Sequence, residues 1–180
     1  FSGTGLKDND SDNKCEGTLR WEVKVAADED AELIQEKARV TTIKELTAYD
    51  TDTIPKGKQR QYSETKLYTV KEVLITKAIL EDDNDIHLVL EDGKGNHMIA
   101  EIPYADCTVA RKSKYAKKYK QVRKSFEKYQ DNFNCYTFNV TGVFFQDKSH
   151  GQTGKAPNDV ELHPVMALSM AKKRECFNLK

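Results

Sequence analysis

Apolar and β-branched residues recur in five stretches of the chain, and each stretch predicts a β-strand. The second stretch shows the clearest period of two, because Ile86, Leu88 and Leu90 occupy alternate positions, as in a strand with one buried face. Gly142 in the fourth stretch predicts a β-bulge, and Pro164 in the fifth predicts a kink or an edge position. The five stretches are residues 67–80 (LYTVKEVLITKAIL), 86–92 (IHLVLED), 97–103 (HMIAEIP), 135–147 (CYTFNVTGVFFQD) and 160–170 (VELHPVMALSM).

Polar turns and one helix separate these strands. EDDND at 81–85 and GKGN at 93–96 predict tight turns that join the first three strands into a meander. Between the third and fourth strands, apolar residues at spacings of four and three predict a helix with one buried face. Those residues are Tyr115, Tyr119, Val122, Phe126 and Tyr129. The order of three strands, one helix and two strands predicts a mainly β, α+β fold, a closed five-stranded barrel of the OB type.

The chain of 180 residues is expected to be this barrel with an addition before it. We assign residues 1–18 to a flexible polar tail, residues 19–64 to an extension that packs on the barrel, and residues 65–180 to the barrel domain. The extension predicts a short strand, then a helix that starts at Asp28, then a short strand or helix at TTIKEL. Trp21 is expected to be a core anchor between extension and barrel.

The formal charge of the chain is zero, but the charges are separated along it. Residues 1–110 hold 14 Lys and Arg against 23 Asp and Glu, whereas residues 111–180 hold 15 against 6. One interpretation of the basic helix is a phosphate-binding face, because clustered cations supply the sequence-independent part of nucleic-acid affinity. The other is a solvated face that pairs with the acidic first half. The nine basic residues of this segment are Arg111, Lys112, Lys114, Lys117, Lys118, Lys120, Arg123, Lys124 and Lys128.

The four cysteines lack the CxxC and Cys/His spacings of a zinc site. Their even number leaves two alternatives, which are disulfides in an oxidising compartment and free buried thiols in a reducing one. In the first alternative, a bridge from Cys107 to Cys135 would tie both ends of the basic helix to the barrel, and Cys15 would pair with Cys176.

The chain starts at Phe1 with a small, polar, acidic segment, as expected after a removed targeting peptide or in a trimmed chain. We expect the protein to be secreted or periplasmic. One version of this prediction is a protein that is lipid-anchored through the removed N-terminal segment. No apolar run approaches the roughly 20 residues that span a bilayer, so we expect no membrane span.

Two segments of the predicted barrel carry a resemblance to known proteins. HLVLEDGKGNHMIAEIP (87–103) and VTGVFFQDKSHGQTGKAPNDVELHPV (140–165) resemble segments of uncharacterised small secreted bacterial proteins. Their upstream segment is similar to RWEVKVAADEDAELI followed by TTIKEL in this chain. The strand order also looks like the barrel of staphylococcal nuclease-like proteins. The resemblance implies an OB-like barrel outside the cytoplasm and supplies no activity.

The resemblance to nuclease-like barrels can be tested by looking for the residues that such enzymes use to bind calcium and phosphate. Such enzymes place carboxylates for a calcium ion and arginines for the phosphate around strands two and three and the helix. Asp92, Glu101 and Asp106 lie near those positions, but these two strands contain no arginine, and the nearest are Arg111 and Arg123. We therefore disfavour calcium-dependent phosphodiester cleavage and interpret Glu101 as a barrel-exterior or polar-network residue.

A second candidate constellation lies in and after the loop 147–159. Glu161 and His163 are two apart on a predicted strand and so point to the same face. Together with His150 they could bind a divalent transition metal that generates a hydroxide for hydrolysis. The alternative is that Glu161 and His163 hydrogen-bond the long loop. We expect the other two histidines, His87 and His97, at the surface.

A non-catalytic binding module is the favoured function, because OB barrels commonly present a strand face and loops to oligonucleotides, oligosaccharides or proteins. A metal-dependent hydrolase that uses His150, Glu161 and His163 is the alternative. The partner is a nucleic acid, a saccharide or a protein, and the sequence indicates no cofactor, no catalytic residue and no oligomeric state. The expected ligand-binding residues are Arg111, Lys114, Lys117, Lys118, Arg123, Lys148, His150, Gln152 and Lys155.

Overall fold

The computed structural model describes residue 15 and residues 20–51, 59–148 and 151–179. The predicted tail, apart from Cys15, lies outside the described residues. His150 and residues 52–58 lie outside them as well. No helix in the described ranges is long and apolar enough to cross a membrane.

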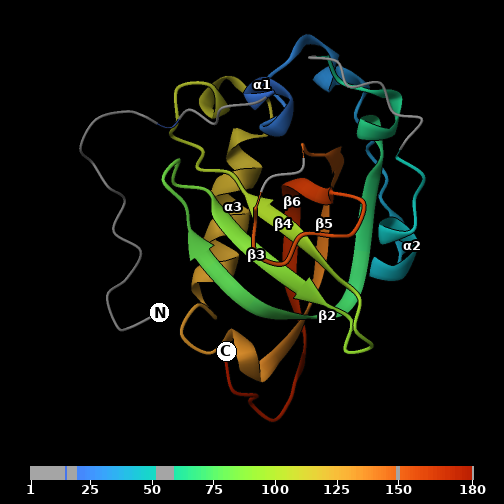
Figure 1. Ribbon diagram of the computed structural model, residues 1–180. Helices are drawn as coiled ribbons and strands as arrows, with labels where there is room; N and C mark the ends of the chain where they lie inside the picture. The colour runs from blue at the N-terminus through green and yellow to red at the C-terminus, as the bar shows by residue number, and fades with distance from the viewer. Residues whose placement is uncertain (1–14, 16–19, 52–58, 149–150, 180) are drawn as a thin grey trace.

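Five strands close into a barrel, as predicted (Figure 1). The sheet order is β2-β3-β4-β6-β5, and β5 pairs back onto β2 to close the ring. β4 and β6 are parallel and the other barrel pairs are antiparallel. This is the strand order of an OB barrel, with the helix between its third and fourth strands. The strands are β2 (Leu67–Leu80), β3 (Ile86–Glu91), β4 (His97–Ile102), β5 (Tyr136–Gln146) and β6 (Val160–Lys173).

The barrel interior is filled by the alternate residues that the sequence pattern predicts. Ile86, Leu88 and Leu90 of β3 are fully buried in the main core. The pairing of β5 with β6 shifts register on both sides of Gly142, which confirms the predicted bulge. A Cβ on Gly142 would lie 2.8 Å from Leu162 Cβ, so only glycine lets the two strands approach this closely.

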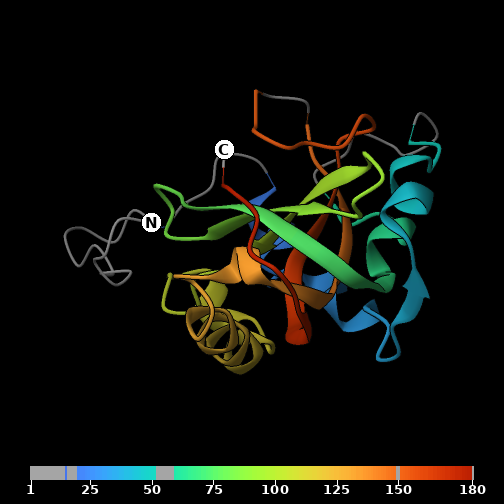
Figure 2. The same ribbon diagram turned by 90° about the horizontal axis from the view of Figure 1, so that it is seen from below.

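Two helices pack on different sides of the barrel (Figures 1 and 2). Helix α3 (Ala116–Glu127) follows a short 3-10 turn, η3 (Ala110–Lys112), and inserts Val122 and Phe126 into the main core. Helix α2 (Ile43–Thr47) contributes Ile43 and Leu46 to the same core. A capping box fixes the start of α2, in which Thr42 Oγ1 accepts from the Glu45 N–H and the Glu45 carboxylate accepts from the Thr42 N–H.

The extension before the barrel differs in part from the prediction. The segment predicted as a strand is helix α1 (Trp21–Lys24). Trp21 at its start and Val25 directly after its end enter one apolar cluster. The turn after Asp28 begins where predicted but is a 3-10 helix, η1 (Glu29–Leu33). Trp21 is buried, as expected of a core anchor, beside residues of the segment between β4 and α3. The remaining elements are β1 (Arg39–Thr41), parallel to β2, and the 3-10 turns η2 (Tyr62–Thr65) and η4 (Phe133–Cys135).

All four cysteines form disulfides, but the predicted pairing is wrong. Cys15 pairs with Cys107, and Cys135 pairs with Cys176. Because α3 has 12 residues, it is about 18 Å long and separates the two cysteines that flank it, whereas disulfide-bonded Cα atoms lie within about 7 Å. Each flanking cysteine instead bonds a cysteine near one terminus of the chain.

Candidate functional site

The basic residues around α3 differ in their burial and in their ion pairs. Arg123 is buried, with its Nη1 donating to the Asn84 carbonyl at 2.8 Å and its guanidinium 4.9 Å from the ring centre of Tyr104. Lys114 pairs with Glu32 and Lys120 pairs with Asp106, each at 2.6 Å. The acidic first half of the chain therefore neutralises part of this segment, as one of the two interpretations predicted.

The other basic residues of this segment are exposed to solvent. Lys117, Lys124 and Lys128 are exposed and have no ion-pair partner within 4.0 Å among the residues that the structure describes. Lys118 is exposed as well and lies 5.6 Å from the ring centre of Tyr115. We call the exposed basic residues of this segment that form no ion pair among the described residues the α3 basic face. They are Arg111, Lys112, Lys117, Lys118, Lys124 and Lys128.

A small hollow of about 170 Å³ lies beside this face. Ligand pockets for drug-sized molecules measure about 300 to 1,000 Å³, so this hollow is too small to enclose such a molecule. Its walls carry charges of both signs. They are formed by Tyr104, Ala105, Asp106, Lys120, Arg123, Lys124 and Glu127.

The predicted loop residues lie away from the α3 basic face. Residues 151–159 pass in front of β3 and β4, whereas α3 lies on the other side of the sheet (Figures 1 and 2). Lys148 is exposed, Gln152 is half-buried, and Lys155 pairs with Asp159 at 2.9 Å. The helix and the loop therefore do not form one continuous surface.

This loop covers the outer face of β3 and β4. The Thr153 carbonyl accepts a hydrogen bond from His87 Nε2 at 2.9 Å. Gly154 packs against Val89 so closely that an added Cβ would overlap both γ-carbons of the valine. Asn158 Nδ2 donates to the carbonyls of Leu46 and Tyr49, which ties the loop to α2. The outer face of β3 and β4 is therefore buried. The exposed fractions of its residues are 1% for His87, 6% for Val89, 0% for Ile99 and 2% for Glu101.

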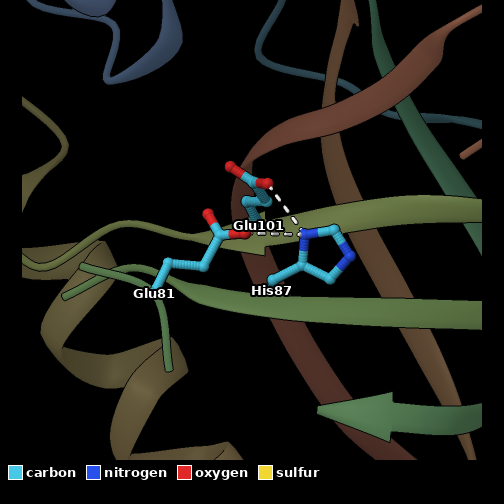
Figure 3. A group of neighbouring side chains, drawn as sticks. All are labelled: Glu81, His87 and Glu101. Carbon is cyan, nitrogen blue, oxygen red and sulfur yellow. Dashed lines mark hydrogen bonds and ion pairs between the residues drawn. The ribbon is translucent and has the colours of Figure 1, made fainter. Parts of the chain in front are cut away.

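Beneath the loop lies a cluster of histidines and carboxylates, of which Figure 3 shows Glu81, His87 and Glu101. His87 of β3 stands directly opposite Glu101 of β4, and its Nδ1 lies 3.1 Å from Glu101 Oε1. Glu81, which follows β2, brings its Oε1 to within 3.3 Å of the same nitrogen. The turn 81–85 closes through the Glu81 N–H, which donates to the Asp85 carbonyl at 3.0 Å, and this positions Glu81 beside the strand pair.

His163 extends the cluster from β6. Its Nδ1 lies 2.9 Å from Glu101 Oε2 and 3.8 Å from Glu161 Oε2, and its Nε2 lies 3.6 Å from Asp85 Oδ2. All four side chains are at most 2% exposed. Glu161 and His163 thus belong to this cluster, and it is His87 that hydrogen-bonds the loop. His150, the third residue of the predicted metal set, lies outside the described residues.

The charges in the cluster shift one another. Burial alone would lower the pKa of His87, but Glu101 and Glu81 raise it to about 10. Burial alone would likewise lower the pKa of His163, and Glu101 and Asp85 raise it well above its usual value. Burial works against ionisation of Glu101, yet His163 and His87 hold its pKa well below the usual range. At neutral pH this arrangement pairs imidazolium ions with carboxylates.

The remaining carboxylates of the cluster ionise less readily than usual. Burial raises the pKa of Asp85 to about 6, although His163 opposes this. Burial and the neighbouring Glu101 raise the pKa of Glu161. Lys24 of α1 is the nearby cation: burial alone would lower its pKa, but Glu161, Glu101 and Asp147 raise it. Its Nζ lies 3.2 Å from Asp147 Oδ2.

The two histidines that were expected at the surface are both less exposed than predicted. His87 is buried, contrary to the prediction of a surface residue, because the loop covers its outward-pointing position. His97 is half-buried at the end of the same hairpin, opposite Glu91. Glu101 is both on the outer face of the barrel and part of a polar network, as interpreted from the sequence.

The fold and this site define an OB-type barrel whose outer β3–β4 face is covered by its own loop. No protein-family model matches the chain, and no curated protein matches its sequence. Among solved structures, the chain is similar to Entamoeba histolytica asparaginyl-tRNA synthetase in complex with asparaginyl-adenylate, at 15% identity and a TM-score of 0.38. The match covers 60% of this chain and 21% of the synthetase. The assignment to OB-type barrels rests on this chain's own strand order.

Proposed function

We propose that the protein is an extracytoplasmic, non-catalytic OB-like module that binds an anionic oligomer, with nucleic acid as the ligand to test, through the α3 basic face. The observation that carries this proposal is the set of exposed lysines on α3 that have no ion-pair partner in the described part of the chain. Clustered lysines attract phosphates without regard to sequence, and their contribution falls as salt rises.

The covered strand face favours the helix over the usual ligand surface. OB barrels commonly bind oligonucleotides and oligosaccharides on strands two and three, which correspond here to β3 and β4. Here the outer face of β3 and β4 is buried and packed against residues 153 and 154. We therefore assign ligand contacts to Lys117, Lys118 and Lys124 and not to Gln152 and Lys155.

The extracytoplasmic part of the proposal is supported by the cysteines. Both disulfides join residues far apart in sequence, with separations of 92 and 41. Such bridges persist in oxidising compartments and are rare where thiols are kept reduced. The resemblance to small secreted bacterial proteins points to the same location.

Charge reversal on the helix tests this function. Fluorescence anisotropy with a labelled single-stranded DNA 20-mer would be measured at two salt concentrations for wild type and for Lys117→Glu/Lys124→Glu. Wild type should bind more weakly at higher salt, and the double variant should lose at least tenfold in affinity because two phosphate contacts become repulsive.

The matched control is Lys77→Glu/Lys94→Glu, which changes the net charge equally at two exposed positions, one on β2 opposite Val89 of β3 and one in the turn 93–96. Its affinity should stay within about twofold of wild type, because screening weakens distant surface charges. Absence of binding at low salt, or equal losses in both double variants, would reject the α3 basic face as a nucleic-acid site.

A further inference from the structure

Three side chains bring ligand atoms together at the mouth of the buried cluster (Figure 3). His87 Nδ1 lies 3.1 Å from Glu101 Oε1 and 3.3 Å from Glu81 Oε1, and the three ligand atoms all lie within 4.8 Å of one another. Two ligand atoms that bind one zinc ion, each at about 2.1 Å and 90 to 109° apart, are separated by about 3.0 to 3.4 Å. The distances from His87 Nδ1 therefore match those between ligands of one cation.

The loop contact decides which ring nitrogen of His87 can bind a metal ion. A carbonyl oxygen only accepts hydrogen bonds, so His87 Nε2 carries the proton that it shares with Thr153. Nδ1 is thereby directed at the two glutamates. Metal-binding histidines commonly donate their other ring N–H to a backbone carbonyl in this way, which fixes the ring and raises the basicity of the ligand nitrogen.

A second layer of side chains holds Glu101 in place. Its Oε1 faces His87, while its Oε2 lies 2.9 Å from His163 Nδ1. His163 lies between two further buried carboxylates: its Nε2 is 3.6 Å from Asp85 Oδ2, and its Nδ1 is 3.8 Å from Glu161 Oε2. These two carboxylates add negative charge behind the ligand set.

The three ligands are open to solvent on one side only. The Glu81 side chain is 31% exposed, whereas those of His87 and Glu101 are 1% and 2% exposed. Glu81 belongs to the acidic turn 81–85, whose Asp83 is half-buried beside it. An ion can therefore enter past Glu81 and keep water in its remaining coordination positions.

We propose that Glu81, His87 and Glu101 bind a divalent transition-metal ion, with His163 as the positioning residue for Glu101. One imidazole nitrogen with two carboxylates suits Zn²⁺ or Mn²⁺, whereas Mg²⁺ prefers an all-oxygen set. The ion takes the place of the proton on His87 Nδ1, which leaves as the ion binds. This site is separate from the α3 basic face, so either proposal can fail without the other.

Calorimetric titration of untagged, chelator-treated protein with ZnCl₂ tests the site, and Mn²⁺ and Mg²⁺ are titrated in parallel. We expect one Zn²⁺ per chain, weaker binding of Mn²⁺ and no measurable binding of Mg²⁺. Glu81→Gln keeps the size of the side chain at a partly exposed position and should weaken Zn²⁺ binding at least tenfold. His87→Gln should abolish binding, with circular dichroism used to check that it folds.

The same hairpin provides a matched control. Glu91 and His97 form a second cross-strand glutamate–histidine pair in the β3–β4 ladder. Glu91→Gln and His97→Gln should leave Zn²⁺ affinity unchanged. Co²⁺ should give a visible ligand-field spectrum with wild type that is lost in Glu81→Gln. No Zn²⁺ binding by wild type, or binding that Glu81→Gln leaves intact, would overturn the proposal.

Discussion

His87 occupies an outward-pointing position on a barrel strand, yet only 1% of it is exposed. The alternation of side chains along β3 determines which face His87 occupies, because successive residues of a strand point to opposite faces. What lies over that face is decided by a loop about 65 residues further along, through the contacts of Thr153 and Gly154 with His87 and Val89. A strand pattern alone therefore cannot separate a solvent-facing histidine from one beneath a loop.

Gly154 is the residue through which this cover can be tested. Its φ of +79° is in the left-handed region, and an added Cβ would overlap Val89, so Gly154→Ala combines backbone strain with overpacking. We expect a loss of about 1 to 3 kcal/mol in the free energy of unfolding, measured by urea denaturation. Gly151→Ala is the control, because a Cβ there meets no atom within 4 Å. Equal stability of the two variants would mean that the loop does not rest on Val89.

Part of the candidate site was within reach of the sequence. The sequence predicts the hairpin 86–103, but pairing the ends of its predicted strands, 86–92 and 97–103, would place His87 opposite Ile102. In the structure β3 ends at Glu91, which lies opposite His97, and His87 therefore lies opposite Glu101. The approach of Glu161 and His163 could not be read in the same way. It depends on the parallel pairing of β4 with β6, in which Ile99 lies beside Glu161, and no turn links those strands to set their register.

At the level of elements, the barrel strands were predictable because each carries its own pattern, and β2 spans the predicted residues 67–80. The extension was less predictable because its elements are short. Helix α1 has four residues, too few for a period of 3.6 to be distinguished from a period of two. Its position comes from contacts with distant segments, among them the ion pair between Arg20 and Glu64 of η2.

Glu64 joins the extension to the barrel and gives the prediction at this scale. Its carboxylate is fully buried and accepts from Arg20 Nη1 at 2.9 Å, from the Gln61 N–H at 2.8 Å and from the Gln146 N–H at 3.2 Å. Glu64→Gln removes the negative charge and replaces one accepting oxygen with an amide NH₂ group, which would face the N–H donors that now bind the carboxylate. We therefore expect a loss of about 3 kcal/mol in the free energy of unfolding.

The control for Glu64 is an ion pair at the surface. Glu72 pairs with Lys172 at 2.8 Å, with both side chains more than half exposed. Glu72→Gln should cost less than about 1 kcal/mol, since solvent screens such pairs. Both variants are compared by urea denaturation. If Glu64→Gln were as mild as Glu72→Gln, the buried carboxylate would not be what attaches the extension.

Across the whole molecule, the charge separation seen in the sequence is only partly cancelled by folding. Glu32 and Asp106 come from the acidic first half and pair with lysines of the basic segment. Other acidic residues of that half, Glu81, Asp85 and Glu101, are drawn into the buried cluster with the histidines. The α3 basic face therefore keeps exposed positive charge even though the chain is neutral overall.

The two disulfides hold this arrangement together and can be tested as a pair. The Cys15–Cys107 bridge closes 92 residues and the Cys135–Cys176 bridge closes 41. On the chain-entropy model, closing these loops stabilises the folded chain by about 4.6 and about 3.9 kcal/mol at 25 °C.

We expect Cys15→Ser/Cys107→Ser and Cys135→Ser/Cys176→Ser each to lower the free energy of unfolding by about 2 to 5 kcal/mol in urea denaturation, the first by slightly more. Replacing both partners avoids a free thiol that could form a new pair. Peptide mapping without reductant should recover only these two linkages, and a Cys107–Cys135 peptide would contradict the observed pairing.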